Sequence, residues 1–440
     1  MMDNTLDFID QASFLGLRAL GHGPVIQYTW IYEHSVDLEG LRRFHRNLGR
    51  GLLGRRIERS PLPFGRHRWI AWPGPADIDV AASPRPRAEV HVWVDEQAAL
   101  RIDPEYGPSW RLAMQPIAEG GAAVTLVLSH TVADGIGGIV AVAEAVNGVD
   151  RNLGYPAVPR PRMSALLADS LRFIREVPAM FRAAVAMARL LRKRGDSVSG
   201  PTRELSGGIS EPVGPVSVPA LTVYGDAGDW DARAAALGGT PTSLFIGVTS
   251  RLGVRLGWVN SDGMVEVTVP VNERTEGDTR GNALIQVSVI VDPGRVCEDL
   301  GSVRSDVKAA LSTLADARRE LLTPLPLVPV VPKAAARRLE GMVIKAGVIG
   351  SSNLGEVAPD ANRPDGTDAD FFSVRMAEHL SKADTRRTRG MFFPVVTGRV
   401  HGRIFISIGY TNADDTTTRD DLVHQVREAL ADFRLSGIIE

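Results

Sequence analysis

The most constraining feature of this 440-residue chain is the segment Leu128–Gly138, where one histidine stands between an apolar run and a glycine-rich turn. The alternation just before His130 predicts a largely buried strand that ends at this residue. Asp134 and Gly135 then predict a turn, and the Ala, Val and Ile content of Ile136–Val146 predicts a packed helix. A histidine at such a strand end is held rigidly.

His130 has the chemistry of a general base. A neutral imidazole can accept a proton from a hydroxyl or an amine while that group attacks a carbonyl. Asp134 is interpreted as a rigid carboxylate that orders the turn through a salt bridge with an arginine elsewhere in the chain. Gly135 and Gly138 leave space beside the imidazole for a bulky substrate. We therefore expect a substrate channel at this turn.

The segment Ser129–Gly135 resembles the HHxxxDG signature of the condensation-type, CoA-dependent acyltransferase superfamily. The resemblance implies that His130 is the catalytic base and that Asp134 has a structural role. Ser129 occupies the position of the first motif histidine. Branches of the superfamily that carry only HxxxDG show that this loss need not abolish activity.

Three further segments extend the resemblance in the expected order. Val269–Arg274, followed by Gly281-Asn282, looks like the strand, arginine and "GN" pattern of bacterial wax ester synthase/diacylglycerol acyltransferases. Ser351–Gly355 resembles the "SN" turn beside the active-site channel, and Leu6–Leu15 resembles the start of the wax ester group. The resemblance places four more residues along the channel: Arg274, Asn282, Ser352 and Asn353.

Each of these positions also has a simpler interpretation. Arg274 pairs with Asp134 in one interpretation and is a solvated charge in a polar stretch in the other. Asn353 could simply turn the chain, because Asn and Gly favour turn conformations. A Ser129–His130 dyad is disfavoured, since neighbouring residues on a strand point to opposite faces.

The resemblance implies an α/β (α+β) fold with two chloramphenicol-acetyltransferase-like subdomains that meet in a V around a channel. We expect an N-terminal subdomain at 1–195, a linker at 196–219 that is rich in Gly, Ser and Pro, and a C-terminal subdomain at 220–440. Periodicity alone shows only a mixture of helices and strands.

The expected activity is transfer of an acyl group from a CoA or carrier-protein thioester to an alcohol or amine. The thioester is a co-substrate, and no permanently bound cofactor is expected. The wax ester or triacylglycerol type is the preferred branch, and an acyl carrier protein is a candidate partner. The alternative is a non-acylating relative that binds or cyclises a polyketide or peptide intermediate. A purely structural docking role does not explain the retained His130 and Asp134.

Composition excludes several other classes. The formal charge of −2 disfavours nucleic-acid binding. Cys297 is the only cysteine, so no intrachain disulfide can form, and the sequence has no metal-ligand spacing. The G-x-S-x-G elbow of hydrolases and the Walker loop are also absent. No signal peptide or spanning helix is predicted, and we expect a cytosolic monomer.

The region Met163–Arg194 is predicted to be helical with a break near Pro178. Nine basic but only two acidic residues lie between Arg160 and Arg194. A basic amphipathic helix can rest on an anionic membrane surface, which would make the protein peripheral to the membrane. The favoured interpretation is a helix packed on the body with its arginines in water.

Other elements follow from periodicity and from turn residues. Helices are expected at Leu38–Leu52, Thr242–Val259, Cys297–Leu322 and Thr418–Phe433, the last with Thr417 or Thr418 as its cap. Strands are expected at Val25–Tyr32, Glu89–Val94, Val265–Val271, Leu284–Val291, Met391–Thr397 and Arg403–Tyr410.

Overall fold

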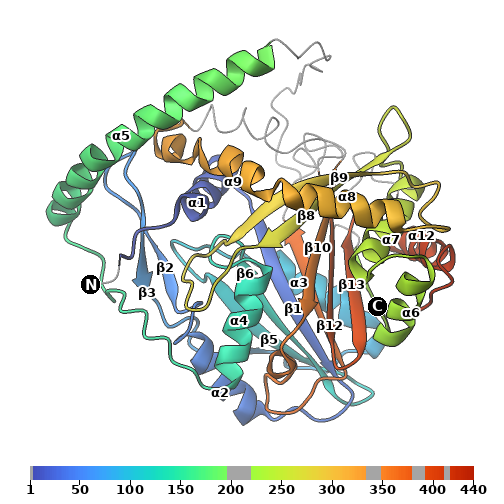
Figure 1. Ribbon diagram of the computed structural model, residues 1–440. Coiled ribbons are helices and arrows are strands. Elements are labelled where there is room, and N and C mark those ends of the chain that lie inside the picture. Colours follow the sequence, from blue (N-terminus) through green and yellow to red (C-terminus); the bar gives the residue numbers. More distant parts are fainter. Residues whose placement is uncertain (1–2, 196–219, 333–347, 379–391, 411–416) are drawn as a thin grey trace.

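Two β-sheets lie next to each other in the centre of the molecule, with helices around them (Figure 1). This mixed α/β architecture with two sheet-containing halves confirms the predicted fold class. The computed structural model describes residues 3–195, 220–332, 348–378, 392–410 and 417–440.

The first sheet has the strand order β11-β1-β6-β5-β4. Its central strand β6 is buried along its whole length, as its nearly continuous apolar sequence predicts. His130 directly follows the last residue of β6, so the sheet fixes the position of the histidine backbone. The strands of this sheet are β1 (Pro24–Tyr32), β4 (Asp79–Val80), β5 (Trp110–Pro116), β6 (Ala122–Ser129) and β11 (Phe371–Glu378).

The second sheet has the order β14-β7-β13-β12-β10-β8-β9. Its strand β9 alternates buried and exposed residues, because one face packs on the core and the other faces solvent. A separate hairpin pairs β2 (Arg55–Glu58) with β3 (Arg68–Ala71). The strands of the second sheet are β7 (Ala220–Asp226), β8 (Val265–Asn272), β9 (Leu284–Val291), β10 (Val348–Glu356), β12 (Phe392–Val400), β13 (Arg403–Gly409) and β14 (Ile438–Ile439).

Strand β11 belongs to the C-terminal half of the sequence but completes the N-terminal sheet. It pairs antiparallel with β1, with Thr29 opposite Ser373. Arg375 of β11 donates to Gln27 Oε1 at 2.7 Å and forms an ion pair with Asp95 at 2.6 Å. The two halves are therefore joined by strand pairing. The expected division into subdomains at 1–195 and 220–440 did not include this exchange.

Helices cover both sheets (Figure 1). α2, α4 and the short 3-10 helix Pro359–Asn362 pack together beside the first sheet, while α6, α7 and α12 cover the second. Two further 3-10 helices span Arg87–Glu89 and Leu325–Val330. The α-helices are α1 (Phe8–Leu20), α2 (Leu38–Leu48), α3 (Val90–Ala99), α4 (Gly135–Val146), α5 (Arg162–Gly195), α6 (Ala227–Ala236), α7 (Pro241–Arg255), α8 (Gly301–Ser312), α9 (Leu314–Leu322) and α12 (Arg419–Ala431).

Most predicted elements are confirmed to within a few residues, but Glu89–Val94 is wrong. This segment is helical, because α3 buries Val90, Trp93 and Val94 at helical spacing. The alternating valines at 90, 92 and 94 imitate the period of a strand. The predicted helix Cys297–Leu322 is in fact two helices that meet at Thr313.

The ends of the other predicted helices are also informative. The helix predicted over Leu38–Leu52 stops at Leu48, where the glycines at 49 and 51 follow. Thr418 is the cap of α12, since its Oγ1 accepts a hydrogen bond from Asp421 N at 3.1 Å. The predicted linker 196–219 and the first residue of the strand predicted at Met391 lie outside the described residues.

Helix α5 runs unbroken through Pro178, so the predicted break is wrong. Proline removes one N–H from the helix, and the carbonyl of Ile174 four residues earlier loses that donor. Ile174 and Pro178 are both exposed, so water can satisfy this carbonyl. None of the described helices is long and apolar enough to cross a lipid bilayer.

The strand exchange gives a first prediction, at Trp30. The Trp30 side chain is fully buried, its Nε1 donates to Ala361 O at 2.8 Å, and its ring lies 5.6 Å from Phe372. Trp30→Phe leaves the Ala361 carbonyl without its donor. We expect a loss of about 1–3 kcal/mol in the free energy of unfolding, measured by urea denaturation.

Trp72→Phe is the matched control for this prediction. Trp72 is only half-buried, and its indole N–H makes no hydrogen bond to any residue in the described part of the chain. Trp72→Phe should lower the free energy of unfolding clearly less than Trp30→Phe does. Equal losses at Trp30 and Trp72 would contradict a specific contribution from the Ala361 bond.

Candidate active site

His130 lies at the start of the turn between β6 and α4, and its ring is half-buried. Its Nδ1 lies 2.9 Å from Asn282 Oδ1. The Asn282 side chain cannot turn over, because its Nδ2 donates to the His130 carbonyl at 3.0 Å and to Asp10 Oδ1 at 3.1 Å. The amide oxygen accepts only, so in the neutral imidazole the proton lies on Nδ1 and the free lone pair on Nε2.

Asp10 is the residue behind Asn282. It is completely buried in α1, and its two oxygens accept the backbone N–H groups of Gly281 and Asn282, both at 2.8 Å. Burial raises the pKa of the Asp10 carboxyl to about 6, while these donors and the charge of Arg55 oppose the shift. Asp10, Asn282 and His130 therefore form one hydrogen-bonded chain that ends at the imidazole.

Asp134 joins the two halves on the other side of the turn. It caps α4, since its Oδ1 accepts from Gly137 N at 2.6 Å, and its Oδ2 accepts from Ala283 N at 2.8 Å. The Arg274 guanidinium lies 3.0 Å from the same Oδ2, and both side chains are about 95% buried. The ion pair between Asp134 and an arginine is thus confirmed, and the partner is Arg274.

Arg274 Nη1 donates to the Arg280 carbonyl at 2.9 Å and Nη2 donates to the Gly281 carbonyl at 3.0 Å, while the buried Nε has no hydrogen-bond partner among the described residues. All of these partners are protein groups in the loop between β8 and β9. Arg274 therefore holds this loop against Asp134, and the interpretation of Arg274 as a solvated charge is wrong.

The two motif glycines allow close packing. A Cβ at Gly138 would lie 2.0 Å from the Tyr28 hydroxyl, which donates to the Gly135 carbonyl at 2.8 Å. A Cβ at Gly135 would lie 3.2 Å from the side chain of Leu354, which follows the Ser-Asn pair of β10. Glycine at 138 thus makes room for Tyr28, and glycine at 135 brings the β10 segment next to the start of α4.

The other predicted channel residues have local partners. Ser129 is buried, and its Oγ accepts from Thr131 N at 3.3 Å. Asn353 donates to Thr242 Oγ1 at 3.1 Å and accepts from Gly355 N at 2.9 Å, so it turns the chain. Ser352 is half-buried in β10. Within the described residues, none of these three side chains is hydrogen-bonded to the His130 ring.

Sequence reasoning missed three residues that hold the site. Asp10 and Tyr28 are described above, and the third is Arg55, which is completely buried over the Trp69 ring. Arg55 donates to the carbonyls of Val132 and Thr279, one in each half. Asp10 lay inside the recognised N-terminal segment, so a weak signal existed for it. Tyr28 and Arg55 had none, because their partners are far away in the sequence.

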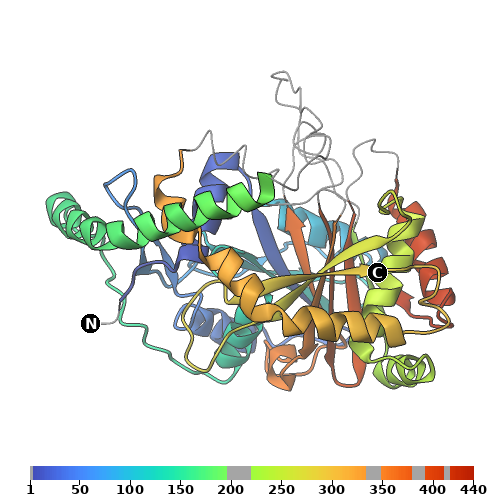
Figure 2. The ribbon, with the colours of Figure 1, turned by 45° about the horizontal axis from the view of Figure 1, so that its top comes forward.

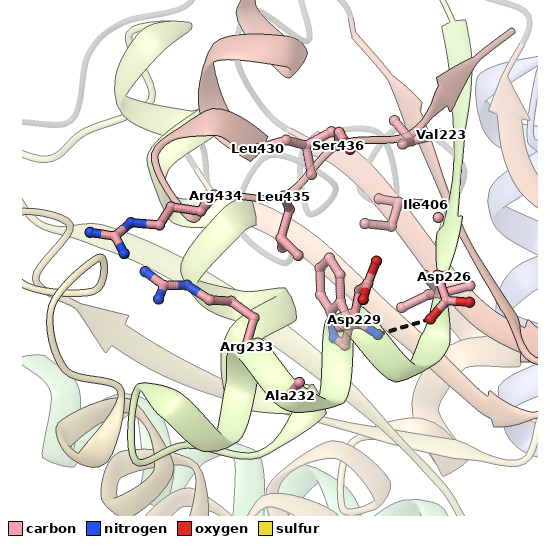
Figure 3. A pocket seen from close by; sticks show the side chains of 13 residues that line it. Val223, Asp226, Asp229, Ala232, Arg233, Ile406, Leu430, Arg434, Leu435 and Ser436 are labelled. Atoms are coloured by element: carbon pink, nitrogen blue, oxygen red, sulfur yellow. Dashed lines mark hydrogen bonds between the residues drawn. The ribbon is translucent and has the colours of Figure 1, made fainter.

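A cavity of about 280 Å³ lies elsewhere, in the C-terminal half (Figure 3). It is lined by α6, β7, β13 and the end of α12, and Arg233 and Arg434 point the same way at one side of it. It contains none of the predicted site residues. The channel expected at His130 therefore stays a prediction.

The site shows no arrangement for a metal or a dinucleotide. No group of three or more His, Cys, Asp or Glu that could hold a metal ion occurs in the described part of the chain. The segment Gly49–Gly54 matches the G-x-G-x-x-G spacing, but it follows a helix and leads into a strand. The dinucleotide fingerprint has the opposite order, strand before helix.

No protein-family model matches the sequence, and no curated protein matches it. Solved structures match over almost the whole chain. Polyketide synthase associated protein 5 from Mycobacterium tuberculosis is 17% identical, with a TM-score of 0.54 over 95% of this chain and 96% of that one. The first condensation domain of the CDA synthetase is 16% identical, with a TM-score of 0.58 over 99% and 97%. The first condensation domain of the calcium-dependent antibiotic synthetase, in complex with substrate analogue 2a, is 16% identical. Its TM-score is 0.59 over 99% of this chain and 98% of that one. The chain has the fold of these condensation domains.

The buried carboxyl of Asp10 gives a pH prediction. Its pKa is about 6 in the folded protein and 3.8 without the fold. Between these values the folded protein holds a proton that the unfolded chain releases, so this group's contribution to stability falls as the pH rises from 4 to 6. Relative to Asp10→Asn, wild type should lose up to about 1.4 kcal/mol of unfolding free energy per pH unit there, measured by urea denaturation at several pH values.

Glu320→Gln, at an exposed position of α9, is the control and should leave the pH slope unchanged. If wild type instead gained stability over Asp10→Asn as the pH rises, the carboxyl would be ionised and stabilised in the folded state. The raised pKa would then be wrong.

Proposed function

We propose that the protein is an acyltransferase with His130 as its general base. It moves an acyl group from a CoA or carrier-protein thioester to the hydroxyl or amine of a small molecule. The proposal includes a cytosolic monomer as the working form.

One observation carries the proposal, namely the defined tautomer of His130. Asn282 Oδ1 requires the proton on Nδ1, which leaves Nε2 ready to accept another. The ring is half-buried, and no described residue makes a hydrogen bond to Nε2. A histidine with only a packing role would not need two further groups, Asn282 and Asp10, to fix its tautomer.

The reaction balances without a covalent enzyme intermediate. His130 Nε2 removes the acceptor's proton while its oxygen or nitrogen attacks the thioester carbonyl, and a tetrahedral oxyanion forms. The oxyanion collapses, the C–S bond breaks, and the imidazolium returns its proton to the leaving thiolate. The product is an ester or an amide together with a free thiol.

His130→Ala tests the base directly. The substitution removes the only group proposed to take the proton, so kcat should fall by about 10²–10⁴-fold while circular dichroism and the unfolding transition persist. The assay follows release of free thiol from an acyl thioester. Turnover equal to wild type would remove His130 from the mechanism.

Two variants sharpen this test. His424→Ala changes an exposed histidine on α12 and should leave turnover unchanged. Asn282→Ala keeps the imidazole but removes the acceptor that fixes its tautomer. We expect Asn282→Ala to lower kcat by less than His130→Ala does, with little effect on KM.

The donor and acceptor are separate parts of the proposal. We propose the wax ester or triacylglycerol type first, because the N-terminal segment and the Val-Pro-Val, Arg and Gly-Asn pattern resemble it. The fold shared with a polyketide synthase associated protein and a condensation domain supports a carrier-bound donor as well.

Paired assays distinguish these donors. Long-chain acyl-CoA with a fatty alcohol or diacylglycerol should give an ester that mass spectrometry detects. Ester formation only from an acyl carrier protein would instead place the protein in secondary metabolism. A ligand bound in native mass spectrometry, with no thioester consumed from any donor, would favour the non-acylating alternative and overturn the proposed function.

A further inference from the structure

Helix α5 carries a row of apolar side chains on its outer face. Met163, Leu167, Leu171, Ile174 and Phe181 repeat every three to four residues, except for one interval occupied by Val177 and Pro178. A spacing of this kind puts them on one side of a helix. Their exposed fractions are 66%, 64%, 58%, 65% and 69%. We call these five residues the α5 apolar stripe.

The inner face of α5 combines apolar and charged side chains. Ala165 and Ala183 are buried on it, and the Phe173 ring lies 4.6 Å from the Phe64 ring. Asp169 is 2% exposed, pairs with Arg160 at 2.9 Å and accepts from Ser60 Oγ at 2.6 Å. Glu176 lies about two helical turns further along the same face. It forms an ion pair with Arg66 at 3.1 Å. These contacts fix the rotation of the helix about its own axis. The apolar stripe is therefore held outward, on the side of the helix away from these contacts.

A row of arginines runs beside the stripe. Arg175, Arg182 and Arg189 are seven residues apart and all exposed, so they follow one edge of the helix. Among the described residues, Arg182 donates to the Pro178 carbonyl alone, and none of the three arginines forms an ion pair. The only acidic residues of α5 are the two on its inner face. The outer face is thus apolar and positively charged.

The position of α5 favours a flat and extended partner. The helix lies along the edge of the molecule, and its N-terminal end extends past the body in both views (Figures 1 and 2). The first and last members of the stripe are 18 positions apart in the sequence, which is about 27 Å at 1.5 Å per residue. An apolar row of this length on the outer edge of the molecule matches an extended surface.

We propose that α5 docks the protein on a lipid surface with anionic headgroups. The α5 apolar stripe enters the boundary between headgroups and acyl chains, and the three arginines contact the headgroup charges. This arrangement gives the uncovered apolar side chains a partner. It takes up the alternative that the sequence left open beside a helix packed on the body with its arginines in water. The inference does not depend on the acyltransferase proposal, because binding is measured without turnover.

The test is co-sedimentation of the full chain with vesicles. Wild type should bind vesicles of equal parts phosphatidylglycerol and phosphatidylcholine, and at least tenfold more weakly to phosphatidylcholine alone. Leu171→Asp with Ile174→Asp should weaken binding to the anionic vesicles at least tenfold. Replacing Arg175, Arg182 and Arg189 by Glu should do the same and remove the dependence on salt.

The matched control is Ile290→Asp, an equally apolar and 57% exposed position on the edge strand β9. It should leave vesicle binding unchanged. Light scattering after size exclusion tests a second copy as the occupant: a wild-type dimer that Leu171→Asp with Ile174→Asp converts to a monomer would overturn the proposal. Vesicle binding that is absent in wild type, or unchanged in both α5 variants, would overturn it as well.

Discussion

Two buried carboxylates determine how the halves of this molecule meet. Asp10 and Asp134 belong to the N-terminal half, and together they accept the three successive backbone N–H groups of residues 281–283 from the C-terminal half. A buried carboxylate is stable only when its donors are in place, and Arg274 supplies the compensating charge for Asp134. The position of Asn282, and with it the orientation of the His130 ring, therefore depends on the whole junction and not on the motif alone.

The strand exchange strengthens this dependence. β11 lies late in the sequence, yet it pairs with β1, and β1 pairs with the β6 strand that presents His130. Opening the junction would expose the buried faces of Trp30 and Phe372 as well as two carboxylates. Relative movement of the halves at this point is costly, which suits a site whose hydrogen-bonded chain crosses between them.

Local sequence predicted the elements whose own periodicity is decisive. The strand before His130 is found because its almost wholly apolar sequence matches burial on both faces. The helix after Asp134 and the strand Leu284–Val291 are found because one buried face sets the pattern of each. The strand predicted at Glu89–Val94 is wrong, because valines at every second position from 90 to 94 give the period of a strand. The buried Trp93 fits only the helical spacing. Asp10 could be recognised as part of a motif but not as a partner of Asn282, which lies 272 positions away. Contacts at such separations follow from the fold, and no local pattern encodes them.

The serine at position 129 has a physical consequence for the motif. Its hydroxyl closes the turn locally by accepting from Thr131 N, and its buried side chain makes no hydrogen bond to the imidazole. The groups that orient His130 come instead from α1 and from the loop between β8 and β9. A residue at 129 can therefore change without changing the tautomer of His130, whereas Asn282 cannot. In this chain the base is specified by its long-range partner, and the neighbouring motif position specifies only the turn.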